Sequence, residues 1–245
     1  LLHYIEAETY YNFKDSPIRL LNLKVTQYDE KGQETYILKS NQAKIHDSGE
    51  IIFSGEVDIL SKGIYHKIET ESLIMDSNTK QISSNKDVIY SGENAIIFAQ
   101  GMHINNADDT MQLEGDIRIE QQSGPIINTK DLNINLADGE KRYQTKEKST
   151  YLSKDNTIHS EQGIDIDMKE NITKLLGRVE ILQESGTKIL SHDLVVDQSN
   201  GGEVYKSNEP TNYQSKSSNI KSQGMYYDTV SQRIELIGGV VGLYE

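Results

Sequence analysis

The sequence contains no cysteine, which excludes a disulfide framework, a zinc–thiolate site and catalysis by a thiol. It contains only three prolines, so β-strands can run long without interruption. Apolar residues make up 35% of the chain, whereas a compact domain usually reaches roughly 45–50% with glycine included. No stretch approaches the ~18–20 continuous apolar residues of a membrane helix. This composition favours an extended sheet over a compact globule.

Basic residues are also scarce, with 25 against 38 acidic residues and a formal net charge of −13. Binding to nucleic acid needs a basic face that neutralises phosphates, so this balance argues against such a partner. It equally argues against docking on an anionic membrane through a polybasic patch.

The periodicity of the apolar residues predicts strands throughout. No run of ten or more residues has the spacing of three and four that indicates a capped helix. Instead, apolar and polar residues alternate over residues 53–59, 113–120, 164–167 and 178–181. This period of two is the signature of a half-buried strand.

A repeat of about sixty residues organises the chain. Four strand-like segments each contain a glycine followed two residues later by a β-branched residue, and the spacings between these glycines are 60, 62 and 61 residues. The glycines are Gly55, Gly115, Gly177 and Gly238. Inside a strand, a glycine usually marks a bend, a bulge or a close backbone approach.

Two further landmarks keep the same phase. Fourteen residues before three of the glycines stand Gln100-Gly101-Met102, Gln162-Gly163-Ile164 and Gln223-Gly224-Met225, with Asn41-Gln42-Ala43 in the first repeat. Leu73, Leu132 and Leu194 follow the first three glycines by 18, 17 and 17 residues. Three markers in phase predict a repeat architecture.

The length of the repeat indicates its architecture. Sixty residues are too many for one rung of a parallel β-helix and rather many for a propeller blade at ~40–50 residues. They suit about four antiparallel strands that run between two facing sheets. We therefore predict an all-β, antiparallel, jelly-roll-like trough of about sixteen or more strands, with an unpaired edge at each end.

The sequence shows no arrangement of catalytic or metal-binding residues. Alternation places both carboxylates of Asp165-Ile166-Asp167 on the outward face of a strand, where solvated charges are ordinary. The six histidines lack metal-ligand spacing, and neither a nucleophile elbow nor a phosphate-binding glycine loop occurs. We expect no catalytic residue, no metal, no cofactor and no enzymatic activity.

The phased motifs resemble the OstA-like repeat of the LptC/LptA/OstA lipopolysaccharide-transport group. Residues 25–40 look most like the start of an LptC periplasmic domain, in which a strand, an acidic-glycine turn and a second strand precede the first repeat. The resemblance covers roughly residues 20–244, which makes residues 1–19 a lead segment and residues 20–245 a β-jellyroll of about four repeats. LptC periplasmic domains are usually shorter by about one repeat, so the chain looks like an extended LptC or an LptC–LptA-like hybrid, and most like the former.

The resemblance implies a non-catalytic transport protein of the periplasm. Members of the group hold lipopolysaccharide acyl chains in an apolar β-trough. They also join edge to edge into a bridge that an inner-membrane ABC transporter feeds. We therefore expect lipopolysaccharide and other Lpt-type β-jellyroll proteins as partners, through edges near residues 25–28 and 234–241. An N-terminal segment that the printed sequence does not contain would supply a membrane anchor.

The expected lipid-binding residues lie on the apolar side of the alternating strands. An apolar face that its own side chains do not fill can bind acyl chains, since apolar burial stabilises by about 25 cal/mol per Å². Methionines on that face would suit irregular lipid packing. The candidates are Phe53, Val57, Ile59, Leu73, Met75, Met102, Ile104, Leu113, Ile117, Ile119, Leu132, Ile134, Ile164, Ile166, Val179, Ile181, Leu194, Val196, Met225, Tyr227, Leu236 and Val240. Lys62, Arg118, Arg178 and Lys188 are candidates to meet lipid phosphates.

Three alternatives stay open at the level of the sequence. The same residues could fill the core of a closed sandwich, as in a surface adhesin or scaffold. A β-solenoid polysaccharide-processing enzyme would need converging carboxylates and basic residues on neighbouring rungs, and the aligned repeats show no such column. A fragment of LptD would belong to the same group.

Overall fold

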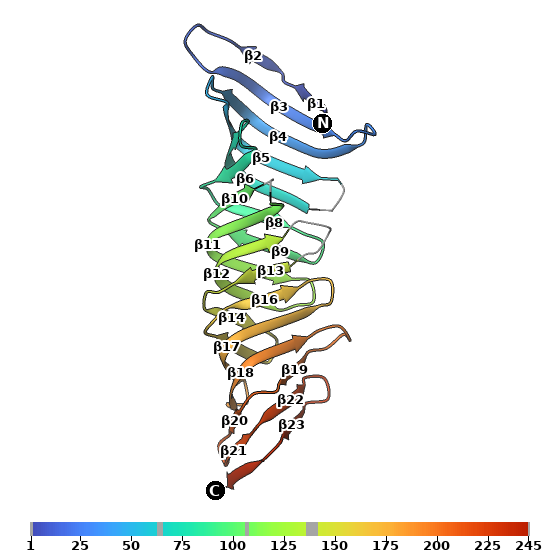
Figure 1. The fold of residues 1–245 in the computed structure, drawn as a ribbon, viewed down its shortest axis with the longest axis vertical. Helices are drawn as coiled ribbons and strands as arrows, with labels where there is room; N and C mark the ends of the chain where they lie inside the picture. The colour runs from blue at the N-terminus through green and yellow to red at the C-terminus, as the bar shows by residue number, and fades with distance from the viewer. Residues whose placement is uncertain (1, 63–65, 106–107, 136–141, 245) are drawn as a thin grey trace. The chain divides into compact units, whose positions relative to one another are not determined.

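The computed structural model describes residues 2–62, 66–105, 108–135 and 142–244. These residues form 24 β-strands and no helix (Figure 1). The strand pairings recorded for this part of the chain are antiparallel throughout, which confirms the predicted all-β antiparallel fold. No helix within the described part is long and apolar enough to cross a membrane.

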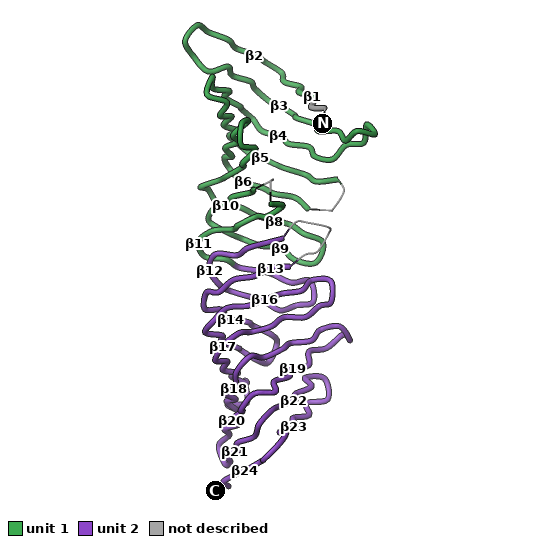
Figure 2. The backbone as a smooth tube through the Cα atoms, in the orientation of Figure 1, with its two compact units in different colours: residues 1–117 green, residues 118–245 purple. Residues whose placement is uncertain are grey.

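The chain divides into two compact units, residues 1–117 and residues 118–245 (Figure 2). Unit 1 contains β1 (Leu2–Glu6), β2 (Thr9–Tyr11), β3 (Ile18–Tyr28), β4 (Glu34–Ile45), β5 (Glu50–Ser61), β6 (His66–Asp76), β7 (Gln81–Ser84), β8 (Val88–Ser91), β9 (Ala95–Ala99), β10 (Gly101–Asn105) and the first part of β11 (Thr110–Gln121).

Unit 2 begins with the last residues of β11. It continues with β12 (Ile126–Asn135), β13 (Arg142–Thr145), β14 (Ser149–Leu152), β15 (Asn156–Ser160), β16 (Ile164–Asp167), β17 (Ile172–Gln183), β18 (Lys188–Asp197), β19 (Val204–Ser207), β20 (Thr211–Gln214), β21 (Ser218–Ser222), β22 (Gly224–Asp228), β23 (Arg233–Ile237) and β24 (Val241–Tyr244).

From β5 onward, each repeat consists of four passes of the chain, and two of the four passes are broken into two short strands. In the repeat that begins at β17, the unbroken passes are β17 and β18, and the broken ones are β19 with β20 and β21 with β22. The first half of β17 pairs with β16 and its second half pairs with β15. The described strands form one continuous hydrogen-bonded sheet, and the long strands bend from one half of it into the other half; we call these two halves the two sheets.

The glycines of the repeat lie at these bends. The register between β17 and β18 shifts between Leu175 and Arg178, on either side of Gly177. Gly55, Gly115, Gly177 and Gly238 have φ values of 73°, 81°, 75° and 73°. This left-handed conformation is costly for a residue with a Cβ atom, so the phased glycines are required by the backbone.

The Gln-Gly landmarks lie at the breaks in the short passes. Gln100 lies between β9 and β10, and Gln162 lies between β15 and β16. A Cβ atom on Gly177 would come within 2.5 Å of the Gln162 side chain, so the glutamine packs directly on the bend. In the first repeat Asn41 takes this place inside the unbroken strand β4 and packs on Gly55 in the same way.

One predicted edge is wrong. Residues 25–28 belong to β3, which pairs with β4 on one side and with β1 on the other. β2 covers the other half of the same strand. The N-terminal edge is therefore formed by β1 and β2, whereas β23 pairs with β22 and leaves the predicted C-terminal edge in place.

Candidate functional site

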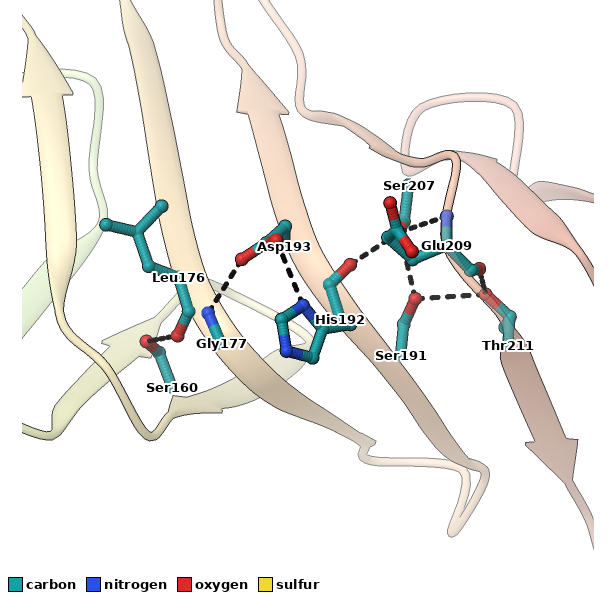
Figure 3. Close-up of polar contacts among 9 residues, drawn as sticks. All are labelled: Ser160, Leu176, Gly177, Ser191, His192, Asp193, Ser207, Glu209 and Thr211. Carbon is teal, nitrogen blue, oxygen red and sulfur yellow. Dashed lines mark hydrogen bonds and ion pairs between the residues drawn. The ribbon is translucent and has the colours of Figure 1, made fainter.

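Buried hydroxyl groups stabilise the bends of unit 2 (Figure 3). Ser191 Oγ lies 3.0 Å from both Ser207 Oγ and Thr211 Oγ1, which belong to the two halves of the neighbouring broken pass. Ser207 Oγ donates to the carbonyl of His192 at 2.7 Å. The last of these bonds satisfies a backbone carbonyl where the strand ladder is interrupted, and the other two satisfy buried hydroxyl groups, as buried polar groups require.

Asp193 closes the bend from the adjacent strand. Its Oδ1 atom accepts a hydrogen bond from the Gly177 backbone N–H at 2.7 Å, and its Oδ2 atom lies 2.9 Å from His192 Nδ1 (Figure 3). Asp193 itself has a φ of 45°, a conformation that a short polar side chain tolerates. The bend is therefore a structural element, and we assign no chemistry to it.

The inner face of unit 1 is apolar but incompletely covered. Ala43, Phe53 and Leu73 are buried on this face. Two residues further from the bend, a second row runs across five strands in register: Ile18, Ile45, Ile51, Met75 and Ile82. All five side chains of this second row are only half-buried. We call this row the isoleucine row.

The row continues on β10 and β11, where it becomes closed. Ile104 of β10 pairs with Ile82 on one side and with Met111 of β11 on the other. Ile104 is 7% exposed and Met111 is 1% exposed. On the second sheet of unit 1, Val25 and Leu38 are likewise half-buried. The uncovered apolar surface therefore lies toward β3–β7.

The inner face of unit 2 is closed. The corresponding row contains Ile134, Tyr143, Ile166, Thr173, Val196, Tyr205 and Tyr227 in register. Each of these side chains is at most 6% exposed. Tyrosines thus stand where unit 1 has aliphatic side chains, and they fill the space between the sheets.

Nineteen of the 22 candidate lipid-binding residues are buried, so the structure places them on the inner faces that their alternation predicts. Met75 and Leu236 are half-buried, and Met75 belongs to the isoleucine row. Val240 lies between β23 and β24 and is 53% exposed, so it is not part of the buried face. Burial alone does not distinguish a lipid site from a packed core.

Sequence reasoning missed the most informative residues of the inner faces. The isoleucine row apart from Met75 was not among the candidates, and neither were Tyr143, Tyr151 and Tyr205. A signal existed, because Ile82, Tyr143 and Tyr205 follow one another at 61 and 62 residues. Alignment of the repeats on this column shows the change from isoleucine to tyrosine.

The Asp165-Ile166-Asp167 segment has the outward carboxylates that alternation predicts, since Ile164 and Ile166, which alternate with them, are buried. Arg142 forms an ion pair with Asp165, and this hydrogen-bonded guanidinium holds the pKa of the Asp165 carboxyl below its usual range. Asp167 accepts hydrogen bonds from the backbone of the following turn. Both carboxylates therefore have structural roles.

No group of three or more His, Asp or Glu residues suited to a metal ion occurs within the described ranges. Of the four basic candidates for phosphate contact, three form ion pairs with nearby carboxylates. Lys62 pairs with Glu34 at 3.6 Å, Arg118 with Glu120 at 2.9 Å, and Lys188 with Glu180 at 2.7 Å.

The chain matches the family described as lipopolysaccharide-assembly, LptC-related, over residues 2–122 and 140–245. It belongs to the LptC family. Nearly the whole chain is matched, which confirms the resemblance that the phased motifs carry. A search among curated proteins gave no match.

Membership of the LptC family implies a role in lipopolysaccharide transport and association with other Lpt proteins. The family is a non-enzymatic transport component with a periplasmic domain. The β-jellyroll fold of the chain agrees with this membership, because both units consist of antiparallel strands that bend between two sheets.

Proposed function

We propose that this LptC-family chain holds lipopolysaccharide acyl chains on the inner face of unit 1 and passes them along a bridge between the inner and outer membranes. The isoleucine row carries the proposal. It is a strip of five aliphatic or methionine side chains in register, and the protein itself leaves all five partly exposed. An acyl chain laid along the row would cover this surface.

The energetics favour an apolar ligand. Covering apolar surface stabilises by about 25 cal/mol per Å², and no directional contact is needed. An acyl chain can therefore slide along such a row without breaking hydrogen bonds, which suits transfer from one protein to the next. Met75, in the middle of the row, has the flexible side chain that irregular lipid packing favours.

The proposed bridge partners are β-jellyroll proteins that pair with the edge strands, and an inner-membrane ABC transporter complex that supplies the lipid. Edge strands present unpaired backbone groups that can extend a sheet into a second protein. Exposed apolar side chains accompany both edges, with Tyr4 and Ile5 on β1 and Leu243 and Tyr244 on β24. Such side chains would be covered in a paired assembly.

Replacing Met75 by glutamine is expected to weaken binding of purified lipopolysaccharide about twofold to fivefold. Complete burial of a methionine side chain is worth about 1.5–3 kcal/mol. Most of the Met75 side chain is already buried in the protein, so at most about a third of that free energy, about 0.5–1 kcal/mol, remains to be gained from the lipid. Equilibrium binding to labelled lipopolysaccharide measures the change.

The matched control is Ile74→Gln on the same strand. Ile74 is also half-buried but faces the opposite side of β6, opposite Ile52. Lipopolysaccharide affinity should be unchanged in this variant. Equal weakening by the two substitutions would contradict binding at the inner face.

A further inference from the structure

The mouth of unit 2, on the side of the sheets away from the bends, is closed by polar contacts from one sheet to the other. Tyr151 of β14 lies in register between Ile127 and Ile158, on an apolar row in which each of the three side chains has no exposed surface. Tyr205 of β19 lies in the corresponding row of the other sheet, in register with Val196. The two tyrosines thus reach toward each other from different sheets.

Glu203 joins the two tyrosines. Tyr151 donates its hydroxyl hydrogen to Glu203 Oε1 at 2.6 Å, and Tyr205 donates to Glu203 Oε2 at 2.5 Å. Burial, and next the Glu203 carboxylate, raises the pKa of both tyrosines, so both hydroxyls remain donors at neutral pH. One carboxylate therefore binds a hydroxyl group from each sheet.

The turn between β14 and β15, together with the first residue of β15, completes the closure. Ser153 Oγ lies 3.1 Å from the Tyr205 hydroxyl, and Asn156 Nδ2 donates to the same oxygen at 3.3 Å. We call Tyr151, Ser153, Asn156, Glu203 and Tyr205 the latch. The Oδ1 atom of Asn156 is buried without a hydrogen-bond partner, so the latch is not fully satisfied in the closed state.

Two more bonds in unit 2 join strand ends that belong to different halves of the fold. Gln198 Nε2, just after β18, donates to Ser123 Oγ at 3.1 Å. Gln121 Nε2, at the end of β11, lies 3.8 Å from Met168 Sδ, just after β16. The mouth of unit 2 is therefore closed by polar side chains over several strands.

The latch is not a general property of the repeat. Lys80 and Lys141 stand at the positions that correspond to Glu203 in the two preceding repeats. At the position of Tyr205, the first of these two repeats has Ile82, which belongs to the partly exposed isoleucine row of unit 1, and the second has Tyr143. The carboxylate that joins the two sheets therefore occurs in one repeat, although the strands around it recur in each.

We propose that the latch closes a second acyl-chain path inside unit 2, and that lipopolysaccharide enters this path when the bonds of Glu203 to Tyr151 and Tyr205 break. This proposal rests on the proposed function and adds a control point to it. Unit 1 would present an open apolar surface, whereas unit 2 would receive lipid only after its sheets part at the mouth.

The chemistry of the latch suits a closure that can be reversed. When the sheets part, water can replace the hydrogen bonds between the Glu203 carboxylate and the two tyrosine hydroxyls, so breaking the latch costs little net free energy. The apolar rows behind the latch gain no such compensation from water. Only an apolar ligand can cover them, and therefore an acyl chain would hold the open state.

The test compares lipid contact inside and outside unit 2 when the latch is removed. A photoreactive diazirine residue is placed at Ile158, which faces inward on β15, or at its outward neighbour His159. Lipopolysaccharide labelling is measured in the otherwise native chain and with Tyr151→Phe plus Tyr205→Phe. These substitutions keep the rings and remove the hydroxyl groups that bind Glu203. We expect labelling at Ile158 to rise at least about threefold, with labelling at His159 unchanged.

Two controls separate the possible outcomes. Tyr226→Phe removes a tyrosine hydroxyl from the outward side of β22 and should leave labelling at Ile158 unchanged. Glu203→Gln, which removes the charge, should raise it as the tyrosine variants do. Unchanged labelling at Ile158, or an equal rise at His159, would overturn the latch proposal. A separate photoreactive residue at Ile51 reports on lipid binding by unit 1. Absence of labelling at Ile51 would contradict the proposed function, whereas labelling at Ile51 without a rise at Ile158 would contradict the latch proposal alone.

Discussion

Replacing Gly177 by alanine is expected to lower the free energy of unfolding of unit 2 by about 2–5 kcal/mol. The residue has a φ of +75°, and the left-handed conformation costs roughly 1–2 kcal/mol for a residue with a Cβ atom. The new Cβ atom would also lie 2.5 Å from the Gln162 side chain, and such overpacking typically costs about 1–3 kcal/mol. Urea unfolding followed by far-ultraviolet circular dichroism measures the change.

The control for this prediction is Gly186→Ala in the turn after β17. Gly186 has a φ of +84°, but a Cβ atom there would meet nothing within 4 Å. This variant should therefore lose only about 1–2 kcal/mol from backbone strain. Equal losses for the two glycines would show that the contact with Gln162 does not stabilise the bend.

Replacing Ile181 by alanine is expected to lower the free energy of unfolding by about 2–5 kcal/mol. Ile181 has no exposed surface and lies between Ile158 and Ile189, so its truncation would leave a cavity among packed side chains. The same unfolding experiment, or native-state hydrogen exchange of β17, measures the loss.

Leu182 offers a control at the next residue of the same strand. It faces outward and is 37% exposed, so Leu182→Ala should cost less than about 1 kcal/mol. A small effect of Ile181→Ala, close to that of Leu182→Ala, would mean that the inner face of unit 2 is loosely packed. The contrast between the closed inner face of unit 2 and the partly exposed isoleucine row of unit 1 would then be wrong.

The fold could be predicted from the sequence to a large extent because the repeat imposes a local requirement at each turn. The phased glycines mark the bends since only they tolerate the backbone conformation found there. Alternation assigned Leu113, Val179 and Leu194 to the buried face, where they have no exposed surface. Period two is sufficient for this, because successive side chains of a strand point to opposite faces.

The edges and the breaks in the short passes could not be predicted in the same way. The pairing of β1 with β3 joins residues 18 to 26 positions apart, and no local pattern in the sequence specifies its register. The breaks between paired short strands depend on where the bulge of the adjacent long strand falls. Strand-like alternation therefore predicts about sixteen or more strands, and the described residues form 24 because two passes of each repeat are broken.

The local sequence pattern also does not predict that the inner face of unit 2 is closed while that of unit 1 is partly open. The column that changes from Ile82 to Tyr205 can be read in the aligned repeats. The bond between Tyr151 and Glu203, however, joins residues 52 positions apart and depends on the spacing of two sheets. Similarly, alternation predicts that Ile51 and Phe53 share a face, but not that Phe53 is buried while Ile51 remains partly exposed.

The most direct test of lipid binding by unit 1 compares two adjacent isoleucines on β5. Ile51 belongs to the isoleucine row, whereas Ile52 lies on the outward face opposite Lys44, and both side chains are half-buried. A photoreactive diazirine residue is placed at each position in turn, and the protein is irradiated with purified lipopolysaccharide. Binding on the inner face predicts labelling at position 51 and little or none at position 52. Equal labelling at the two positions, or labelling only at position 52, would contradict it.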